Sequence, residues 1–193
     1  MYSTFLIEGL AVGLTLGGLA HATRLQGGEW ARQWFVGAYL AALIRETLNQ
    51  VIFQIYVFPP DTLRVGAAPA LITLLSGSVA YLAFQFARRF VAPTQPILFT
   101  GLVLLIAASF ALPLEATAAQ MQWWVYMSPT PLVFGAVPLT ALLVWGGGAA
   151  IYYAVFQRVR GARLPERGKF YAIVAVAPLV AAAQLLLAVL LNA

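Results

Sequence analysis

Six apolar stretches, separated by short polar segments, run along the chain. They cover approximately residues 4–22, 34–58, 66–87, 97–114, 132–156 and 170–191. A helix that crosses a bilayer needs about 20 largely apolar residues. The pattern therefore predicts an all-α integral membrane protein with six transmembrane helices, in a single domain over residues 1–193. The apolar pattern allows the fourth helix to continue past Pro113 as far as Trp123.

Composition narrows the class further. Of the 193 residues, 62% are hydrophobic and 9% are charged, and the mean hydropathy is +0.87. A soluble domain has roughly 45–50% apolar and about 25% charged residues, so a water-soluble globule is excluded, as is a disordered chain. The first apolar stretch is not expected to be a cleaved signal, because it lacks a basic start and carries Glu8.

The basic residues predict the orientation of the chain. Nine of the eleven fall in the first, third and fifth connections, which lie on one side if there are six spans. Arg64 falls on the opposite side, and Arg45 within the second span. Basic connections stay in the cytoplasm, so we expect both termini outside it, in the cytoplasmic membrane of a bacterium or archaeon. The pI near 9.9 then reflects topology, and no nucleic-acid partner is expected.

An internal repeat emerges when the chain is shifted by 69 residues. Without a gap, 12 positions over residues 38–89 are then identical. Glu46 falls on Glu115. Apart from matches of alanine or leucine, which are common in this chain, the other identities are Pro60 on Pro129, Gly66 on Gly135, Pro69 on Pro138, Gly77 on Gly146 and Arg89 on Arg158. The copies, about 34–90 and 103–159, each hold two helices. The two copies should therefore run in the same direction and be related by a pseudo-twofold axis along the membrane normal. Such an axis would bring both glutamates toward one site.

Ionisable groups inside a span are costly and are candidates for function. Glu46 shares a helical face with Asn49 and Gln50, and Gln54 follows one turn later. This polar stripe predicts either interhelical hydrogen bonding or a pocket with a proton donor. Arg45 is expected to point away from Glu46 and to pair with a carboxylate on another helix, with Glu115 as one candidate.

Aromatic residues gather at the expected membrane surfaces. Trp30 and Trp34 flank the inner end of the second span, and Trp123, Trp124 and Tyr126 fall in an outer connection. Anchoring at the interface is the simplest interpretation, although aromatic faces such as that of Trp145 also stabilise cations.

Glycines form a stripe on the first helix. Gly9, Gly13 and Gly17 recur every four residues, which lets a neighbouring helix approach closely, within the chain or in a homo- or hetero-oligomer. The chain has no cysteine and a single histidine, His21, which is expected to be a hydrogen-bonded residue near the membrane surface. We expect neither a metal nor a cofactor.

Both copies of the repeat resemble the membrane carotenoid-biosynthesis proteins that include carotenoid hydratases. The first copy has Glu46, Tyr56 and the run Val65-Gly66-Ala67-Ala68-Pro69-Ala70-Leu71. The second has Glu115, Trp123-Trp124, the run Phe134-Gly135-Ala136-Val137-Pro138-Leu139, and Trp145. The chain departs from the family where an acid is replaced by Ala111, an asparagine by Ala141 and a tryptophan by Ser76.

The resemblance implies acid-initiated hydration or cyclisation at the end of an acyclic carotenoid or similar hydrophobic isoprenoid. Glu46 and Glu115 would be the catalytic pair. The expected substrate-binding residues are Asn49, Gln50, Gln54, Tyr56, Trp123, Trp124 and Trp145. Two other interpretations stay open: a non-catalytic membrane subunit or carotenoid- or lipid-binding scaffold of the same fold, and a small proton- or cation-coupled transporter.

Overall fold

The computed structural model of the chain describes residues 4–127, 131–134 and 137–192. These residues form six α-helices: α1 (Phe5–Gln26), α2 (Gly28–Leu48), α3 (Leu74–Ala87), α4 (Pro96–Met121), α5 (Leu139–Arg160) and α6 (Glu166–Asn192). A π-helical turn, η1 (Asn49–Phe53), extends α2. Six two-residue strands follow the helical segments: β1 (Tyr56–Val57), β2 (Arg64–Val65), β3 (Ala68–Pro69), β4 (Val125–Tyr126), β5 (Leu132–Val133) and β6 (Val137–Pro138). The helical class predicted from the sequence is confirmed.

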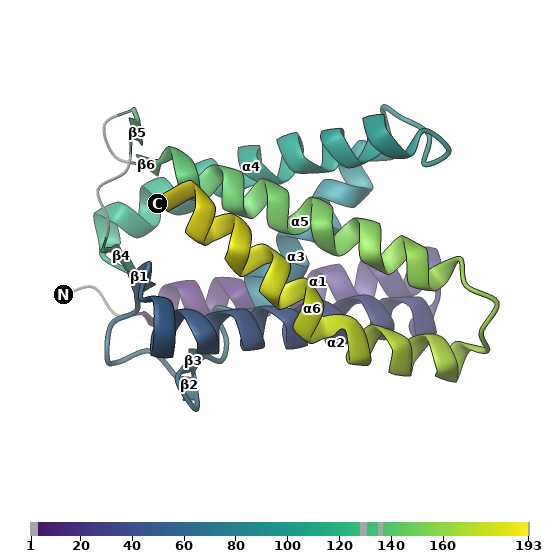
Figure 1. Cartoon of the computed structure of the whole chain (residues 1–193), viewed down its shortest axis with the longest axis horizontal. Helices are drawn as coiled ribbons and strands as arrows, with labels where there is room; N and C mark the ends of the chain where they lie inside the picture. The colour runs from purple at the N-terminus through teal and green to yellow at the C-terminus, as the bar shows by residue number, and fades with distance from the viewer. Residues whose placement is uncertain (1–3, 128–130, 135–136, 193) are drawn as a thin grey trace.

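The helices form a bundle of two roughly parallel pairs joined by two oblique helices (Figure 1). In that view α4 and α5 lie along the top, and α1 and α2 along the bottom. Helix α6 crosses obliquely and packs on α2 and α5, whereas α3 packs on α1, α2, α4 and α5. All six helices therefore share one interior.

The two ends of the bundle differ in their connections. The α1–α2, α3–α4 and α5–α6 connections gather at one end, and most basic residues lie in them or in the adjoining helix turns, whereas the described strands, the start of α1 and the end of α6 lie at the other end (Figure 1). Gly27 makes the first of these connections possible, because its φ of 91° ends α1 one residue before α2 begins. We call the two ends the basic end and the strand end. Which of them faces the cytoplasm stays a prediction.

Four helices, α1, α4, α5 and α6, are long and apolar enough to cross a membrane. Helix α3 is apolar but has only 14 residues, which is about 21 Å at 1.5 Å per residue. Helix α2 has 21 residues but carries Glu29, Arg32, Arg45 and Glu46. The structure thus supports a helical membrane protein, while the count of six spans stays a prediction.

Three predicted spans begin or end at the wrong residue. The second was expected to reach residue 58, but the helix breaks after Phe53 and Tyr56 lies in a strand. The third and fifth were expected to begin at 66 and 132, but antiparallel hairpins, β2–β3 and β5–β6, occupy those positions. Pro69 and Pro138 close the hairpins, where a backbone N–H is not needed. The fourth helix does continue past Pro113.

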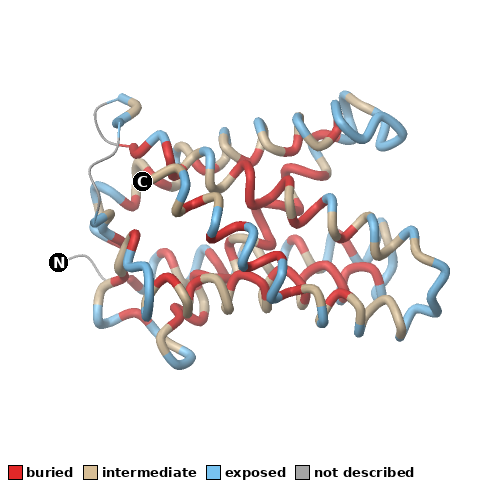
Figure 2. Tube along the Cα trace, viewed as in Figure 1, coloured by how far each residue is buried: buried red, intermediate tan, exposed pale blue. Residues whose placement is uncertain are grey.

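The buried parts of the chain lie in the middle of the bundle (Figure 2), and aromatic side chains form much of the largest buried cluster. Trp30 stacks on Trp34 with ring centroids 5.1 Å apart, and both pack against Phe84 and Phe156. Trp34 is fully buried and its indole N–H donates to the Gly77 carbonyl. Interface anchoring was therefore the wrong prediction for these two tryptophans, which belong to the core.

The glycine stripe of α1 is not used for packing inside the chain. A Cβ placed on Gly9, Gly13 or Gly17 would meet no other atom within 4 Å. Gly18 is the glycine that packs, since a Cβ there would lie 3.0 Å from the Phe35 ring. The stripe is thus left facing outward, and its role in an oligomer stays a prediction. His21 hydrogen-bonds to the Tyr81 hydroxyl at 2.8 Å.

Candidate functional site

A small pocket lies toward the strand end of the bundle, and both candidate glutamates line it. Its volume is about 40 Å³, room for roughly three water molecules. The full lining is Arg45, Glu46, Tyr56, Phe58, Ile72, Thr73, Ser76, Glu115, Trp124, Tyr126, Ala141, Val144 and Trp145. The pocket therefore combines two carboxyl groups, one guanidinium and an aromatic wall.

Glu46 lies in the last turn of α2 and is 3% exposed. The guanidinium of its neighbour Arg45 folds back onto it, with Nε donating to Oε1 at 3.0 Å and Nη2 also bonding that oxygen. The Tyr56 hydroxyl is 2.8 and 2.9 Å from the two carboxyl oxygens. Arg45 also donates to Ser76 Oγ at 3.1 Å. The prediction that Arg45 points away from Glu46 and pairs elsewhere is wrong.

Glu115 lies two residues after Pro113 in α4 and is 2% exposed. Three neutral donors surround it: the indole N–H groups of Trp145 at 2.7 Å and Trp124 at 3.0 Å, and the Tyr126 hydroxyl at 3.2 Å. Among the described residues no cationic side chain forms a salt bridge with it. The two glutamates thus differ in their partners, since only Glu46 has a counter-charge.

A short strand pair joins the two glutamate environments. Strands β1 and β4 are antiparallel, with Tyr56 opposite Tyr126 and Val57 opposite Val125. The Met127 N–H extends this ladder by donating to the Ile55 carbonyl at 2.9 Å. The two tyrosine rings are 5.5 Å apart between centroids, close enough to interact across the strands.

Local electrostatics keep the Tyr126 hydroxyl a donor. Burial raises the pKa of Tyr126 well above its usual value. The hydroxyl therefore stays protonated at any physiological pH.

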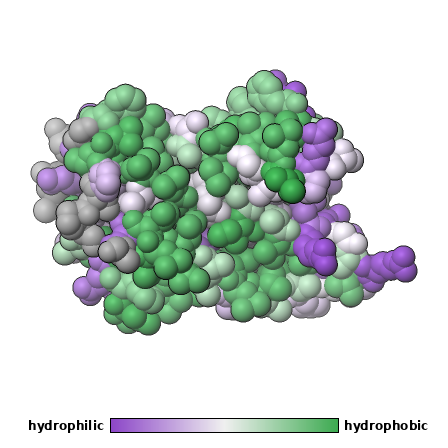
Figure 3. Space-filling model, turned by 45° about the horizontal axis from the view of Figure 1, so that its top comes forward, coloured by the Kyte–Doolittle hydropathy of each residue, from purple (hydrophilic) through white to green (hydrophobic). Residues whose placement is uncertain are grey.

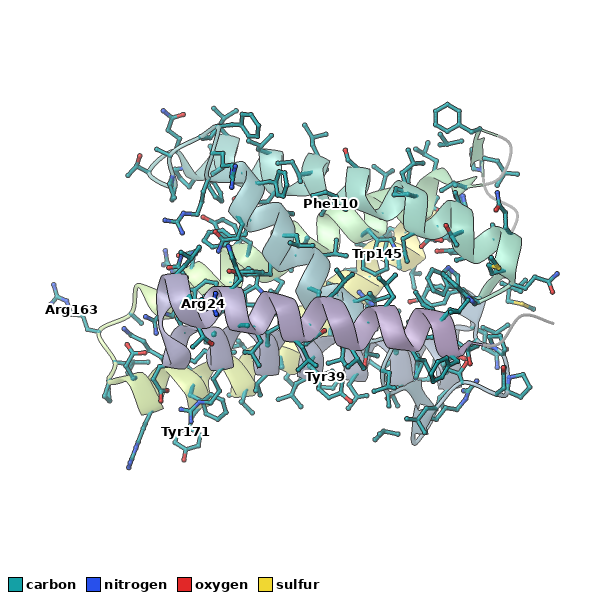
Figure 4. The ribbon with its side chains drawn as sticks, turned by 180° about the vertical axis from the view of Figure 1, so that it is seen from behind. Arg24, Tyr39, Phe110, Trp145, Arg163 and Tyr171 are labelled. Carbon is teal, nitrogen blue, oxygen red and sulfur yellow. The ribbon has the colours of Figure 1, made fainter. Side chains whose placement is uncertain are left out.

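Trp145 occupies the interior of the bundle, between the helix pair α1 and α2 and the pair α4 and α5 (Figure 4). It comes from α5, one helix after Glu115, and its indole N–H makes the shortest of the bonds to that carboxyl. By contrast, Arg163 extends away from the bundle at the basic end (Figure 4).

Not every predicted substrate-binding residue lines the pocket. Asn49 and Gln50 each donate to the Tyr56 carbonyl at 2.9 Å, and the Asn49 side chain also accepts the Ile55 N–H. Gln54 is exposed and ends the π-helical turn with a φ of 48°. These amides hold the chain reversal that carries Tyr56 to the pocket, and Trp123 is buried beside Trp124 without lining it.

A second, smaller cavity adjoins the pocket on the side away from the strands. Its volume is about 20 Å³, and it shares Arg45, Ser76 and Trp145 with the pocket. It also reaches Tyr152 and Gln184, whose amide donates to the Gly148 carbonyl at 2.9 Å. Beyond Tyr152 lies the packed aromatic core.

Sequence reasoning missed several members of this site, among them Tyr126, which was expected only as an interface anchor, Ser76 and Phe58. Ser76 was treated only as the loss of a family tryptophan, yet its hydroxyl holds the Arg45 guanidinium. Its position 69 residues before Trp145 was the available signal. Phe58 was not considered, although its ring packs edge-on against Trp124 with centroids 5.8 Å apart. The described residues contain no group of three or more His, Asp or Glu side chains placed to bind a metal.

No protein-family model, no curated protein and no solved structure matches this chain. The chemistry of the pocket is therefore inferred from its own geometry.

Proposed function

We propose that the pocket is an acid–base site that protonates an alkene dissolved in the membrane, at the end of an acyclic carotenoid or a similar isoprenoid. The observation that carries this proposal is the meeting of Glu46 and Glu115 in one buried pocket with aromatic walls. Alkene protonation needs an acid, and the tertiary cation that results needs aromatic faces and a base. The sequence resemblance to carotenoid hydratases points to the same chemistry.

The partners of the two glutamates support distinct roles. Arg45 balances the charge of Glu46, so Glu46 acts as the carboxylate and base. Glu115 is buried among neutral donors, and a second negative charge in the pocket would have no counter-ion. Glu115 therefore carries the transferable proton.

The reaction balances without a cofactor. Glu115 gives its proton to the less substituted carbon of the terminal double bond, and the π electrons form the new C–H bond. Water adds to the tertiary cation, and Glu46 accepts the proton that this water loses. The product is a tertiary alcohol, and return of the proton to Glu115 completes the cycle. In the cyclising variant, the π electrons of a second double bond of the chain attack the tertiary cation and close the ring. Glu46 then removes a proton from the carbon next to the new ring cation, which leaves a ring double bond.

The size of the pocket sets a requirement on this proposal. The pocket has room for only a few water molecules, and an isoprenoid end needs more, so the proposal requires side chains to move when the substrate binds. Trp145 and Trp124 are the side chains whose displacement would open the most room, because a tryptophan ring is the largest side chain. Their hydrogen bonds to Glu115 would then break as the substrate binds.

A non-catalytic scaffold is the second candidate, and two observations favour it. The two carboxyl groups of the pocket already have hydrogen-bond partners within the chain, and the glycine stripe of α1 is open for a partner helix. A transporter is less well supported, since the aromatic core between the pocket and the basic end offers no polar path among the described residues.

We also propose that the chain contains an internal repeat and crosses the membrane six times. The two segments after α2 and α4 run through the same order of a β1–β4 ladder strand, a hairpin and a further helix. Glu46 and Glu115 come from equivalent positions of these segments. Pro129, Gly135 and Ala136, which the repeat and the resemblance also use, lie outside the described residues.

Expression in a lycopene-producing bacterium tests the proposal. The chain should convert lycopene to a more polar or a cyclised carotenoid, separable by chromatography. Glu46→Gln and Glu115→Gln should each abolish the conversion, because each removes a proton acceptor or donor while keeping the side-chain shape.

Glu8→Gln is the matched control, since Glu8 accepts the Leu63 N–H at the surface and lies outside the pocket. It should leave the pigment conversion intact. Unchanged pigment from well-folded parent protein would reject this activity on lycopene, and the scaffold would then be favoured.

A further inference from the structure

Large apolar side chains are exposed on both β-hairpins of the strand end. On β2–β3, Leu63 and Val65 are 56% and 54% exposed, and on β5–β6, Leu132 and Phe134 are 55% and 86% exposed. Phe134 also has a φ of 53°, a region that bulky residues rarely adopt. Exposed apolar groups of this size on loops indicate a surface that contacts something other than water.

Charge is nearly absent from these hairpins. No charged residue occurs between Glu115 and Arg158, a range that includes the whole second hairpin. The first hairpin contains Arg64, but its guanidinium donates to the backbone carbonyls of Phe58, Pro59 and Ala67. The carbonyl groups of the loop therefore accept the hydrogen bonds of this cation. In a loop that projected into water, the guanidinium could hydrogen-bond to solvent instead.

The apolar hairpin surface continues into the helices. Leu139 and Leu143, on the first turns of α5 directly after β6, are 41% and 39% exposed. Since α5 is long and apolar enough to cross a membrane, exposed leucines on it face lipid. Hydrophobic surface covers much of the face seen in Figure 3.

We propose that both hairpins insert into the adjoining bilayer leaflet, at the interface between headgroups and acyl chains. Each hairpin is a sheet of only two described strands, so no further strand pairs with its outer edges, and open sheet edges are not tolerated in the hydrocarbon core. The interface accepts both such edges and the apolar side chains. The occupant of this surface is therefore phospholipid, and the two hairpins set the depth of the strand end in the membrane.

The test uses the absence of cysteine from the chain. Single cysteines introduced as Val65→Cys and Phe134→Cys are spin-labelled, and the protein is reconstituted in vesicles of phosphatidylcholine and phosphatidylglycerol. Power-saturation electron paramagnetic resonance then compares collisions with oxygen, which partitions into lipid, and with a nickel chelate, which stays in water. Leu105→Cys on α4, where Leu105 is 62% exposed, serves as the lipid reference, and Arg163→Cys as the water reference.

Labels at 65 and 134 should collide with oxygen several-fold more often, relative to the chelate, than the label at 163 does. Their depth should lie between those at 105 and 163. A label that matches position 163 would overturn the proposal, because the hairpins would then stand in water. If the labels collide with neither oxygen nor the nickel chelate and show spin–spin broadening between chains, the proposal would also be overturned, because a second copy would then cover the surface. Leu132→Cys replaces Phe134→Cys if that variant loses its helical circular dichroism.

Discussion

The two glutamates of the pocket occupy equivalent places in the chain but unlike surroundings. Arg45 precedes Glu46, whereas the residue that precedes Glu115 is Leu114. Thirty residues further along, the first site has Ser76 and the second has Trp145. Arg45 and Ser76 contact each other, and the indole of Trp145 bonds Glu115 directly.

This difference shows how the residues at positions 45 and 76 act together. A serine at position 76 leaves room that a tryptophan would fill, and the Arg45 guanidinium uses that room to reach both Ser76 and Glu46. At the second site the tryptophan itself supplies the hydrogen bond, and no cation is present. One carboxyl is thus charge-balanced and the other is only hydrogen-bonded, which is the asymmetry that an acid and a base require.

The largest effect is expected from Arg45→Leu, which gives the first site the residue of the second. Glu46 would be left as a buried charge without a partner, and breaking a buried pair on one side costs about 3–5 kcal/mol. The free energy of unfolding can be measured in mixed micelles of mild detergent and dodecyl sulfate, followed by tryptophan fluorescence.

The double variant Arg45→Leu/Glu46→Gln is the control for this prediction. It removes the unpaired charge and should recover at least half of the lost stability. Glu115→Gln should cost less than Arg45→Leu, because it leaves no buried charge without a partner. Equal stability of Arg45→Leu and the parent would show that Glu46 does not depend on the ion pair.

A smaller effect is expected at the second site from Trp124→Phe. The ring is largely retained, but Glu115 loses a hydrogen bond of 3.0 Å in a buried position, for a cost of about 1–3 kcal/mol. Trp123→Phe is a matched control, since Trp123 is its neighbour, is equally buried and has an indole N–H with no described partner. Both are measured in the same unfolding assay, and a Trp123→Phe cost as large as that of Trp124→Phe would contradict the role given to the bond.

The pairing of Glu46 and Glu115 could be anticipated because the offset of 69 residues is visible in the sequence. The helices could be anticipated because hydrophobic length is a strong signal in a membrane protein. Helix α4 continues past Pro113 as expected, since neighbouring groups compensate for one missing N–H.

The hairpins could not be anticipated from hydropathy alone, because their residues are as apolar as those of the helices. Only Gly66 and the prolines Pro69 and Pro138 marked them, and these residues are also common in transmembrane helices. Arg45 was misplaced for a different reason. Side chains at adjacent helix positions diverge at Cβ, but the arginine stem is long enough to fold back onto Glu46.

The tyrosines offer a finer comparison of the two sites. Tyr56→Phe should cost about 1–2 kcal/mol, because its hydroxyl bonds both oxygens of an ion-paired carboxylate at 2.8 and 2.9 Å. Tyr126→Phe should cost about 0.5–1 kcal/mol, because its single bond to Glu115 is longer, at 3.2 Å. The order of the two unfolding free energies is the measurement, and the reverse order would show that Glu115 depends on its tyrosine more than Glu46 does.

A small effect, in the same range as that of Tyr126→Phe, is expected from Ser76→Ala, at about 0.5–1 kcal/mol. The change removes one acceptor of Arg45, yet the guanidinium keeps both of its bonds to Glu46. Ser109→Ala is the matched control, because Ser109 is on the lipid-facing side of α4 and bonds only the Leu105 carbonyl of its own helix. If Ser76→Ala cost as much as Arg45→Leu, the serine would be holding the arginine in place rather than completing its hydrogen bonds. The small size of the side chain at position 76 would then not be enough to explain why Arg45 reaches Glu46.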